Sequence, residues 1–86
     1  MITAEKARAR AIRNMKLQFD TEDLEHVEDK IYEAVDECRF AINVKMADEM
    51  PNTASHKQKR LLIEYLRLNG YNAFYVADIL EIRWQI

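Results

Sequence analysis

The sequence predicts a two-layer α+β fold in which helices cover one face of a three-stranded sheet. Two patterns support this prediction. Apolar residues recur at helical spacing in three stretches. They alternate with other residues in two further stretches, and a third is rich in aromatic and β-branched residues. The predicted order is α-α-β-α-β-β, with two layers around one core. The length of 86 residues, with one glycine and one proline, predicts a single domain over residues 1–86.

The first two predicted helices differ in the strength of their apolar stripes. The first is capped by Thr3, and its stripe of mainly small residues indicates close packing on another element or on a partner. The second is capped by Asp20 or Thr21 and has an acidic face opposite a full apolar face. The two apolar sets are Ala4, Ala7, Ala11, Ile12 and Met15, and then Leu24, Val27, Ile31, Ala34, Val35 and Cys38. We expect Cys38 to lie in the core, where a thiol is poorly reactive.

The period changes from helical to alternating after the second helix. Residues 40–46 predict a half-buried strand, and residues 47–54 predict a loop. Ser55, followed three residues later by Gln58, forms a capping-box pattern that begins the third helix. Gly70 marks the end of that helix.

The last stretch predicts a β-hairpin with its turn near Ala77 and Asp78. Its second strand is expected to leave an apolar sheet edge at Trp84 and Ile86, and such an edge is either covered or paired with another chain. This edge predicts a homo-oligomer. The predicted interface residues are Tyr75, Trp84 and Ile86.

The net charge of −2 hides a segregated distribution. Residues 1–16 carry five bases and one acid, residues 20–49 carry eleven acids and three bases, and residues 50–86 carry five bases and three acids. The segregation matters more for partners than the net charge does.

Basic residues open the third helix, where the positive end of the helix dipole disfavours cations. Two interpretations follow. Internal pairing to the acidic second helix, Asp48 or Glu49 is the preferred one, and an anion or partner site is the other. The first helix carries a second basic stripe, for which pairing with the acidic second helix, within or between subunits, is the preferred interpretation. The candidate binding residues are Ser55, His56, Lys57, Lys59, Arg60, Arg10 and Arg13.

No pattern of catalytic chemistry stands out. The single glycine excludes a phosphate-binding glycine loop, and zinc-type pairs of Cys or His at short spacing are absent. Glu22, His26 and Asp29 can share a helical face, which we interpret as solvated. We therefore predict no enzyme activity, no metal and no cofactor. The absence of a signal-like or membrane-spanning segment and the lone cysteine predict a cytoplasmic protein.

The stretch LRLNGYNAFYVADILEIRW at residues 66–84 and the opening TAEKAR resemble short bacteriophage-encoded proteins. In these, a helix ending in Leu is followed by Gly-Tyr, a strand, a turn and a final strand near a Trp. The resemblance covers most of the chain and implies a phage or prophage origin and no particular activity. This sequence departs from it at the hairpin turn, which lacks the usual glycine.

The leading functional hypothesis is a small accessory protein that acts as a homo-oligomer and binds a host or phage macromolecule. A protein is the first candidate for this partner, and nucleic acid or a nucleotide is a further one. An alternative is a protein that sequesters a nucleotide or another anionic small molecule, with phosphates at the start of the third helix. A small structural protein of the virion is a third hypothesis.

Overall fold

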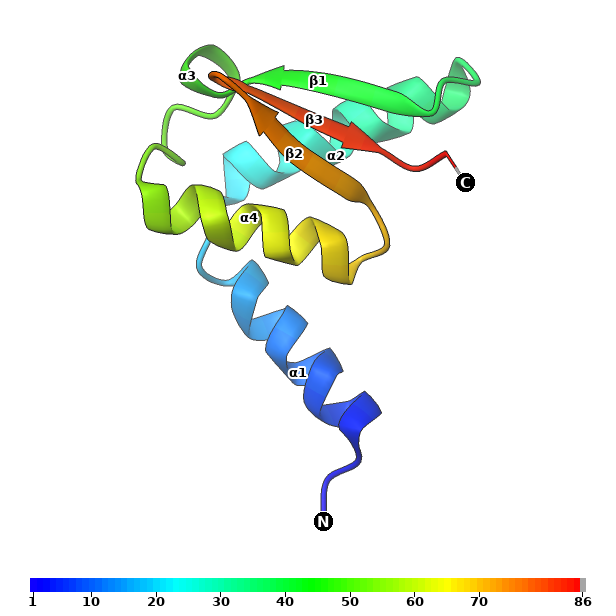
Figure 1. The fold of residues 1–86 in the computed structure, drawn as a ribbon, viewed down its shortest axis with the longest axis vertical. Helices are drawn as coiled ribbons and strands as arrows, with labels where there is room; N and C mark the ends of the chain where they lie inside the picture. The colour runs from blue at the N-terminus through cyan, green and yellow to red at the C-terminus, as the bar shows by residue number, and fades with distance from the viewer. Residues whose placement is uncertain (86) are drawn as a thin grey trace.

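The computed structural model describes residues 1–85 and confirms the predicted α+β class (Figure 1). Ile86, one of the predicted interface residues, lies outside the described residues. The three strands form one antiparallel sheet in the order β1-β3-β2. The elements are α1 (Ala4–Lys16), α2 (Thr21–Asp36), β1 (Ala41–Lys45), α3 (Met46–Glu49), α4 (His56–Leu68), β2 (Asn72–Val76) and β3 (Ile79–Arg83).

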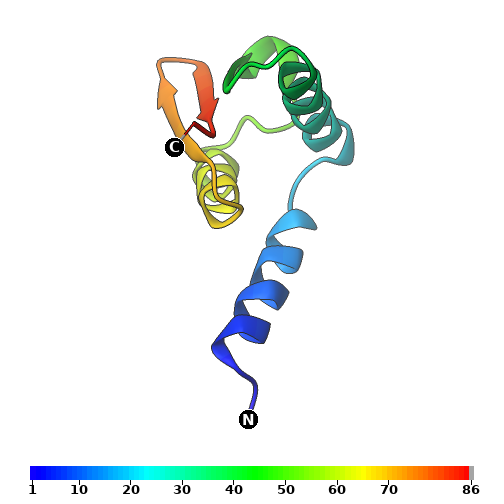
Figure 2. The same cartoon turned by 90° about the vertical axis from the view of Figure 1, so that its right-hand side faces the viewer.

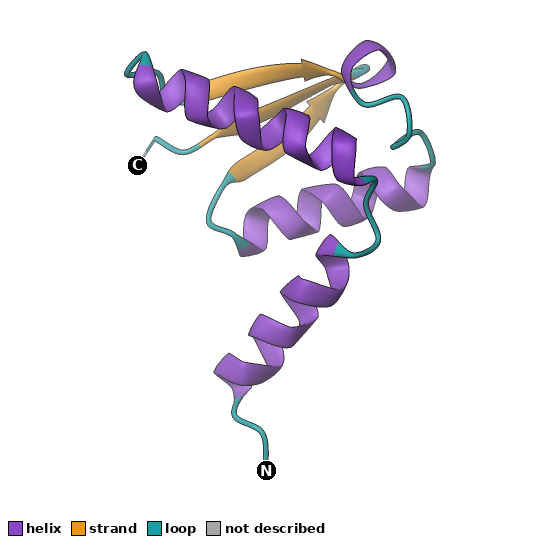
Figure 3. Ribbon diagram, turned by 180° about the vertical axis from the view of Figure 1, so that it is seen from behind, coloured by secondary structure: helices purple, strands orange, loops and turns teal. Residues whose placement is uncertain are grey.

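Two long helices cover one face of the sheet and leave the other open. Helix α2 packs against β1, and α4 packs against β2, so the central strand β3 lies above the space between them (Figure 3). In β1, Ile42 and Val44 are buried while their sequence neighbours in the strand are exposed, as expected for a sheet with one covered face.

Cross-strand register builds the core. Ile82 of β3 pairs with Ile42 on one side and Ala73 on the other, and all three are buried. The helices add buried side chains such as Val27 of α2 and Leu62 of α4, both almost inaccessible to solvent. Apolar burial on this one face supplies the main stabilising free energy of the fold.

The predicted helix caps are confirmed. The side chains of Thr3, Asp20 and Ser55 each accept a hydrogen bond from the backbone N–H three residues further on. Helix α4 ends at Leu68, and Gly70 follows just after the cap residue Asn69 with a φ of +93°, a conformation that residues with a side chain rarely adopt.

Two predictions about the sheet and its loops are wrong. The predicted loop over residues 47–54 overlaps the one-turn helix α3, which is too short to produce a helical period in the sequence. The last strand is not an edge, because β3 lies in the centre and pairs with both neighbours. The apolar edge that predicted self-association is therefore absent from β3, whose apolar side chains Leu80 and Ile82 lie in the core.

Cys38 was predicted to lie in the core, and this is also wrong. Helix α2 ends at Asp36, and Cys38 follows with a φ of 60° and an exposed side chain. The left-handed backbone at this residue redirects the chain toward β1, so the helical spacing that placed Cys38 on the apolar face no longer applies.

Helix α1 is arranged differently from the rest of the chain. It projects from the sheet and its two covering helices, and only its C-terminal end comes close to α4 (Figure 2). Within α1 no residue is buried, although Ile12 and Met15 are partly covered.

Candidate functional site

The start of α4 presents basic side chains to solvent. Ser55 caps the helix by accepting a hydrogen bond from the N–H of Gln58 at 3.1 Å. His56, Lys57 and Arg60 are exposed, and within residues 1–85 none of the three takes part in an ion pair. The first N–H groups of a helix have no intrahelical carbonyl partner and give this end a partial positive charge. The three basic side chains therefore lie beside a helix end of the same charge.

These side chains border a shallow hollow of about 360 Å³ on the surface of α4. Besides the three bases, it is lined by Leu61 and Glu64. Residues 56, 60 and 64 succeed one another at four-residue intervals, so they lie along one side of the helix. The hollow can hold an acidic group from a partner, but its lining includes no aromatic ring that would stack on a base.

The structure separates Lys59 from the other candidate bases. Its Nζ lies 3.8 Å from a carboxylate oxygen of Asp78 in the hairpin turn, and its backbone carbonyl accepts a hydrogen bond of 2.8 Å from the Tyr75 hydroxyl. Burial raises the pKa of Tyr75 to about 12. Lys59 and Tyr75 therefore connect α4 to the hairpin within the molecule.

The remaining predicted residues lie elsewhere. Arg10 and Arg13 are exposed on α1, and the bases of α1 form no ion pair with any described residue. The predicted pairing with α2 was within or between subunits, and the form within one molecule is absent from the described residues. Trp84 is half-buried and packs edge-to-face on Tyr71, with ring centroids 6.0 Å apart.

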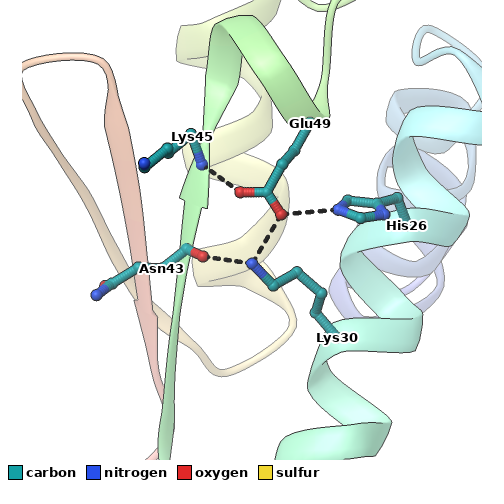
Figure 4. Close-up of polar contacts among 5 residues, drawn as sticks. All are labelled: His26, Lys30, Asn43, Lys45 and Glu49. Carbon is teal, nitrogen blue, oxygen red and sulfur yellow. Dashed lines mark hydrogen bonds and ion pairs between the residues drawn. The ribbon is translucent and has the colours of Figure 1, made fainter.

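Glu49 is the centre of a polar cluster that joins three elements (Figure 4). One carboxylate oxygen lies 2.9 Å from Nε2 of His26 and accepts a hydrogen bond of 2.7 Å from Nζ of Lys30. The other accepts the backbone N–H of Lys45 at 2.7 Å. Lys30 also donates to the backbone carbonyl of Asn43 at 2.6 Å.

The cluster covers backbone groups along the outer edge of β1. Burial alone would raise the pKa of Glu49, but hydrogen bonds from Lys30, His26 and the Lys45 N–H, with the charge of Lys30, lower it to about 2. At the other edge of the sheet, Arg67 donates to the carbonyl of Ala73 in β2. Side chains that occupy edge groups hinder pairing with a strand from another molecule.

Sequence reasoning considered Glu49 only as a partner for the bases of α4. The structure instead pairs it with α2, and Asp48 forms no ion pair within the described residues. The available signal was the four-residue spacing of His26 and Lys30, which places both on one side of a helix.

Within residues 1–85, no group of three or more His, Cys, Asp or Glu side chains is placed to hold a metal ion. None of the helices in the described part of the chain has the length and apolar character needed to cross a bilayer. No protein-family model, curated protein or solved structure matches this chain.

Proposed function

We propose that the protein is a small phage-type accessory protein that works by binding, as a homo-oligomer, an acidic surface of a host or phage protein. The observation that carries this proposal is the group of exposed bases His56, Lys57 and Arg60 at the start of α4, which have no ion-pair partner in residues 1–85. Cations at this helix end repel the dipole unless an anion is bound, so an acidic partner relieves an unfavourable local arrangement.

A role in binding, without catalysis, agrees with the contacts of the residues whose pKa values are shifted. Glu49 and Tyr75 are both engaged in hydrogen bonds that join elements of the fold. Structural hydrogen bonds and burial are sufficient to explain these two shifted pKa values, so a catalytic role is not required to account for them. We also propose the cytoplasm as the site of action, since Cys38 is a lone exposed thiol, which suits a reducing compartment.

The test uses labelled polyglutamate as an acidic probe and measures binding by fluorescence anisotropy. The double variant Lys57→Gln/Arg60→Gln is expected to weaken binding about tenfold, since two charged contacts are lost. The matched control is Arg39→Gln/Lys45→Gln, which removes the same charge from exposed positions elsewhere. Equal weakening by both variants would show a general effect of net charge and contradict the proposal, as would tighter binding to a DNA duplex of equal charge.

The alternative of a nucleotide-binding protein rests on the same surface. It has weaker support, because the hollow offers cations for phosphates but no ring for a base. Thermal-shift measurements with nucleoside triphosphates test it, because a ligand that binds only the folded state raises the melting temperature. A rise that disappears in Lys57→Gln/Arg60→Gln would favour the nucleotide over the acidic protein.

A further inference from the structure

Helix α1 makes few of the contacts that normally hold a helix in place, because only its C-terminal end comes close to α4. Among residues 1–85 it is the one helix with no buried residue, and it projects away from the sheet (Figures 1 and 2). An isolated helix of 13 residues is only marginally stable in water, since most helix stability in proteins comes from packing an apolar face. The stripe of Ala4, Ala7 and Ala11 is such a face and is exposed.

A groove runs along α2, and its central part lies between α2 and α4. Its central hollow, of about 380 Å³, is lined by Leu24, Val27 and Ile31 of α2, by Tyr65 and Leu66 of α4, and by other residues that flank them. Two further hollows continue it, because they share lining residues with the central one. The hollow at one end shares with the central one Lys16, Leu24 and Glu28. The hollow at the other end shares with it Ile31, Asn69 and Tyr71.

The dimensions of groove and helix agree. The hollows follow α2 from Leu24 to Val35, which at 1.5 Å per residue is about 16 Å. The 13 residues of α1 are about 20 Å long on the same basis. Apolar side chains along this path remain open to solvent, with 69% of Tyr32 and 51% of Val35 exposed. The small side chains of the α1 stripe allow its backbone to approach such a surface closely.

Charge also favours this pairing. Residues 1–16 carry five bases and one acid, whereas α2 carries seven acids and one lysine. Glu25 and Glu28 line the groove directly, and Asp29 is exposed beside them. The bases of α1 have no ion-pair partner among the described residues, so this attraction is unused in a single molecule.

Helix α1 of the same molecule does not lie in this groove. Lys16 at the end of α1 lines the mouth of the groove, and only residues 17–20 separate α1 from α2. From this point α1 of the same molecule leads away from α2 and α4 (Figures 1 and 2). We infer that α1 of one copy lies in the α2–α4 groove of a second copy, and that the second α1 lies in the groove of the first. Such an exchange is a closed two-fold arrangement.

This inference deepens the self-association in the proposed function, and it does not depend on the bases of α4. The experiment is sedimentation velocity over a range of protein and salt concentrations. The wild type is expected to reach about twice the chain mass of 10.2 kDa, with tighter association at low salt. A wild type that is monomeric at every concentration, or that forms larger oligomers, would overturn the inference.

Single substitutions locate the contact. Ala11→Glu places a carboxylate on the stripe that faces the acidic groove, and we expect the dissociation constant to rise at least tenfold. Ala9→Glu is the matched control, because residue 9 lies on the opposite side of α1 and the change adds the same charge. Neither residue is buried, so neither change disturbs the core. Equal effects of the two variants would overturn the inference.

The groove is tested in the same way from its other side. Glu28→Lys reverses a charge on the groove lining and is expected to weaken the dimer, whereas Glu33→Lys, on the exposed acidic side of α2, is expected to leave it intact. The Lys57→Gln/Arg60→Gln variant should keep the dimer mass. If this variant loses polyglutamate binding and remains a dimer, the loss is due to the α4 site alone. If a groove variant loses the dimer and still binds polyglutamate, the loss is due to the groove alone.

Discussion

Helices α1 and α4 have the same length but very different surroundings. Both begin with a side-chain cap, and both carry an apolar stripe. The stripe of α4 contains Leu62 and Leu66, which are buried against the sheet, whereas the stripe of α1 consists mostly of alanine and contains no buried residue. A buried leucine contributes roughly 1.5–3 kcal/mol, while an alanine side chain offers little apolar area. Capping and periodicity therefore specify a helix. The size of its apolar side chains decides whether the helix is packed against the rest of the same molecule.

The largest expected effect comes from shortening a core side chain of α4. Leu62 is fully buried, so Leu62→Ala removes apolar contacts and leaves a cavity, and we expect the free energy of unfolding to fall by about 2–5 kcal/mol. Urea denaturation followed by circular dichroism measures this. Leu17→Ala, directly after α1 and with 76% of its surface exposed, is the control. At concentrations where the protein is monomeric it should change the value by less than about 0.5 kcal/mol. Similar losses in the two variants would contradict the contrast between α4 and α1.

A smaller effect is expected at Glu49, which joins α2 to the edge of β1. Its pKa is lowered from 4.5 to about 2 in the folded protein, so its stabilising contribution is complete above pH 4.5 and is lost as the pH falls toward 2. Because the side chain is 23% exposed, solvent screening reduces the contribution, and we expect about 1–2 kcal/mol.

The pH dependence is measured by urea denaturation of the wild type and Glu49→Gln between pH 6 and pH 2.5. The difference in stability between the two proteins should be largest at pH 6 and should shrink as the pH falls, because Glu49 of the wild type takes up a proton. The other carboxylates titrate equally in both proteins and cancel from the difference. A difference that stays constant over this range would show that Glu49 is not held as a carboxylate by its three hydrogen-bond donors.

The smallest effect is expected in α1 itself. Ala7→Gly lowers helix propensity by about 1 kcal/mol at an exposed position, which should reduce the helical signal of α1. At concentrations where the protein is monomeric, the urea midpoint of the remaining structure should hardly move, since α1 buries no residue. Circular dichroism at 222 nm and the urea midpoint are read on the same samples. A midpoint shift comparable to that of Leu62→Ala would show that α1 is coupled to the core.

Local pattern was sufficient for most of the elements. The alternation around Val44 and the cap-and-glycine boundaries of α4 predicted the observed β1 and α4, because both depend on neighbouring residues. The hairpin turn was also placed correctly, at Ala77 and Asp78, although Ala77 adopts a φ of 55° without being glycine.

The errors arose where the outcome depends on distant residues. Strand order is not written in a strand's own pattern, so the central position of β3 and the loss of the predicted edge at Trp84 were not foreseen. Cys38 continued a helical spacing beyond the residue where the helix ends. Lys59 also differs from the other bases of α4 because of a distant residue, since its ion-pair partner Asp78 lies in the hairpin turn.

The central position of β3 has a consequence for the order in which the molecule is assembled. β1 and β2 make no direct pairing with each other, so the sheet has no connected form until the last strand is in place. Ala41 of β1 pairs with Arg83 of β3, which lies far along the sequence. A chain synthesised from its N-terminus therefore exposes β1 long before β3 is made. The contacts of Glu49 with His26 and Lys30 involve only residues made by then. During synthesis, Glu49 and Lys30 can therefore bind the backbone groups on one edge of β1 before β3 pairs with the other edge.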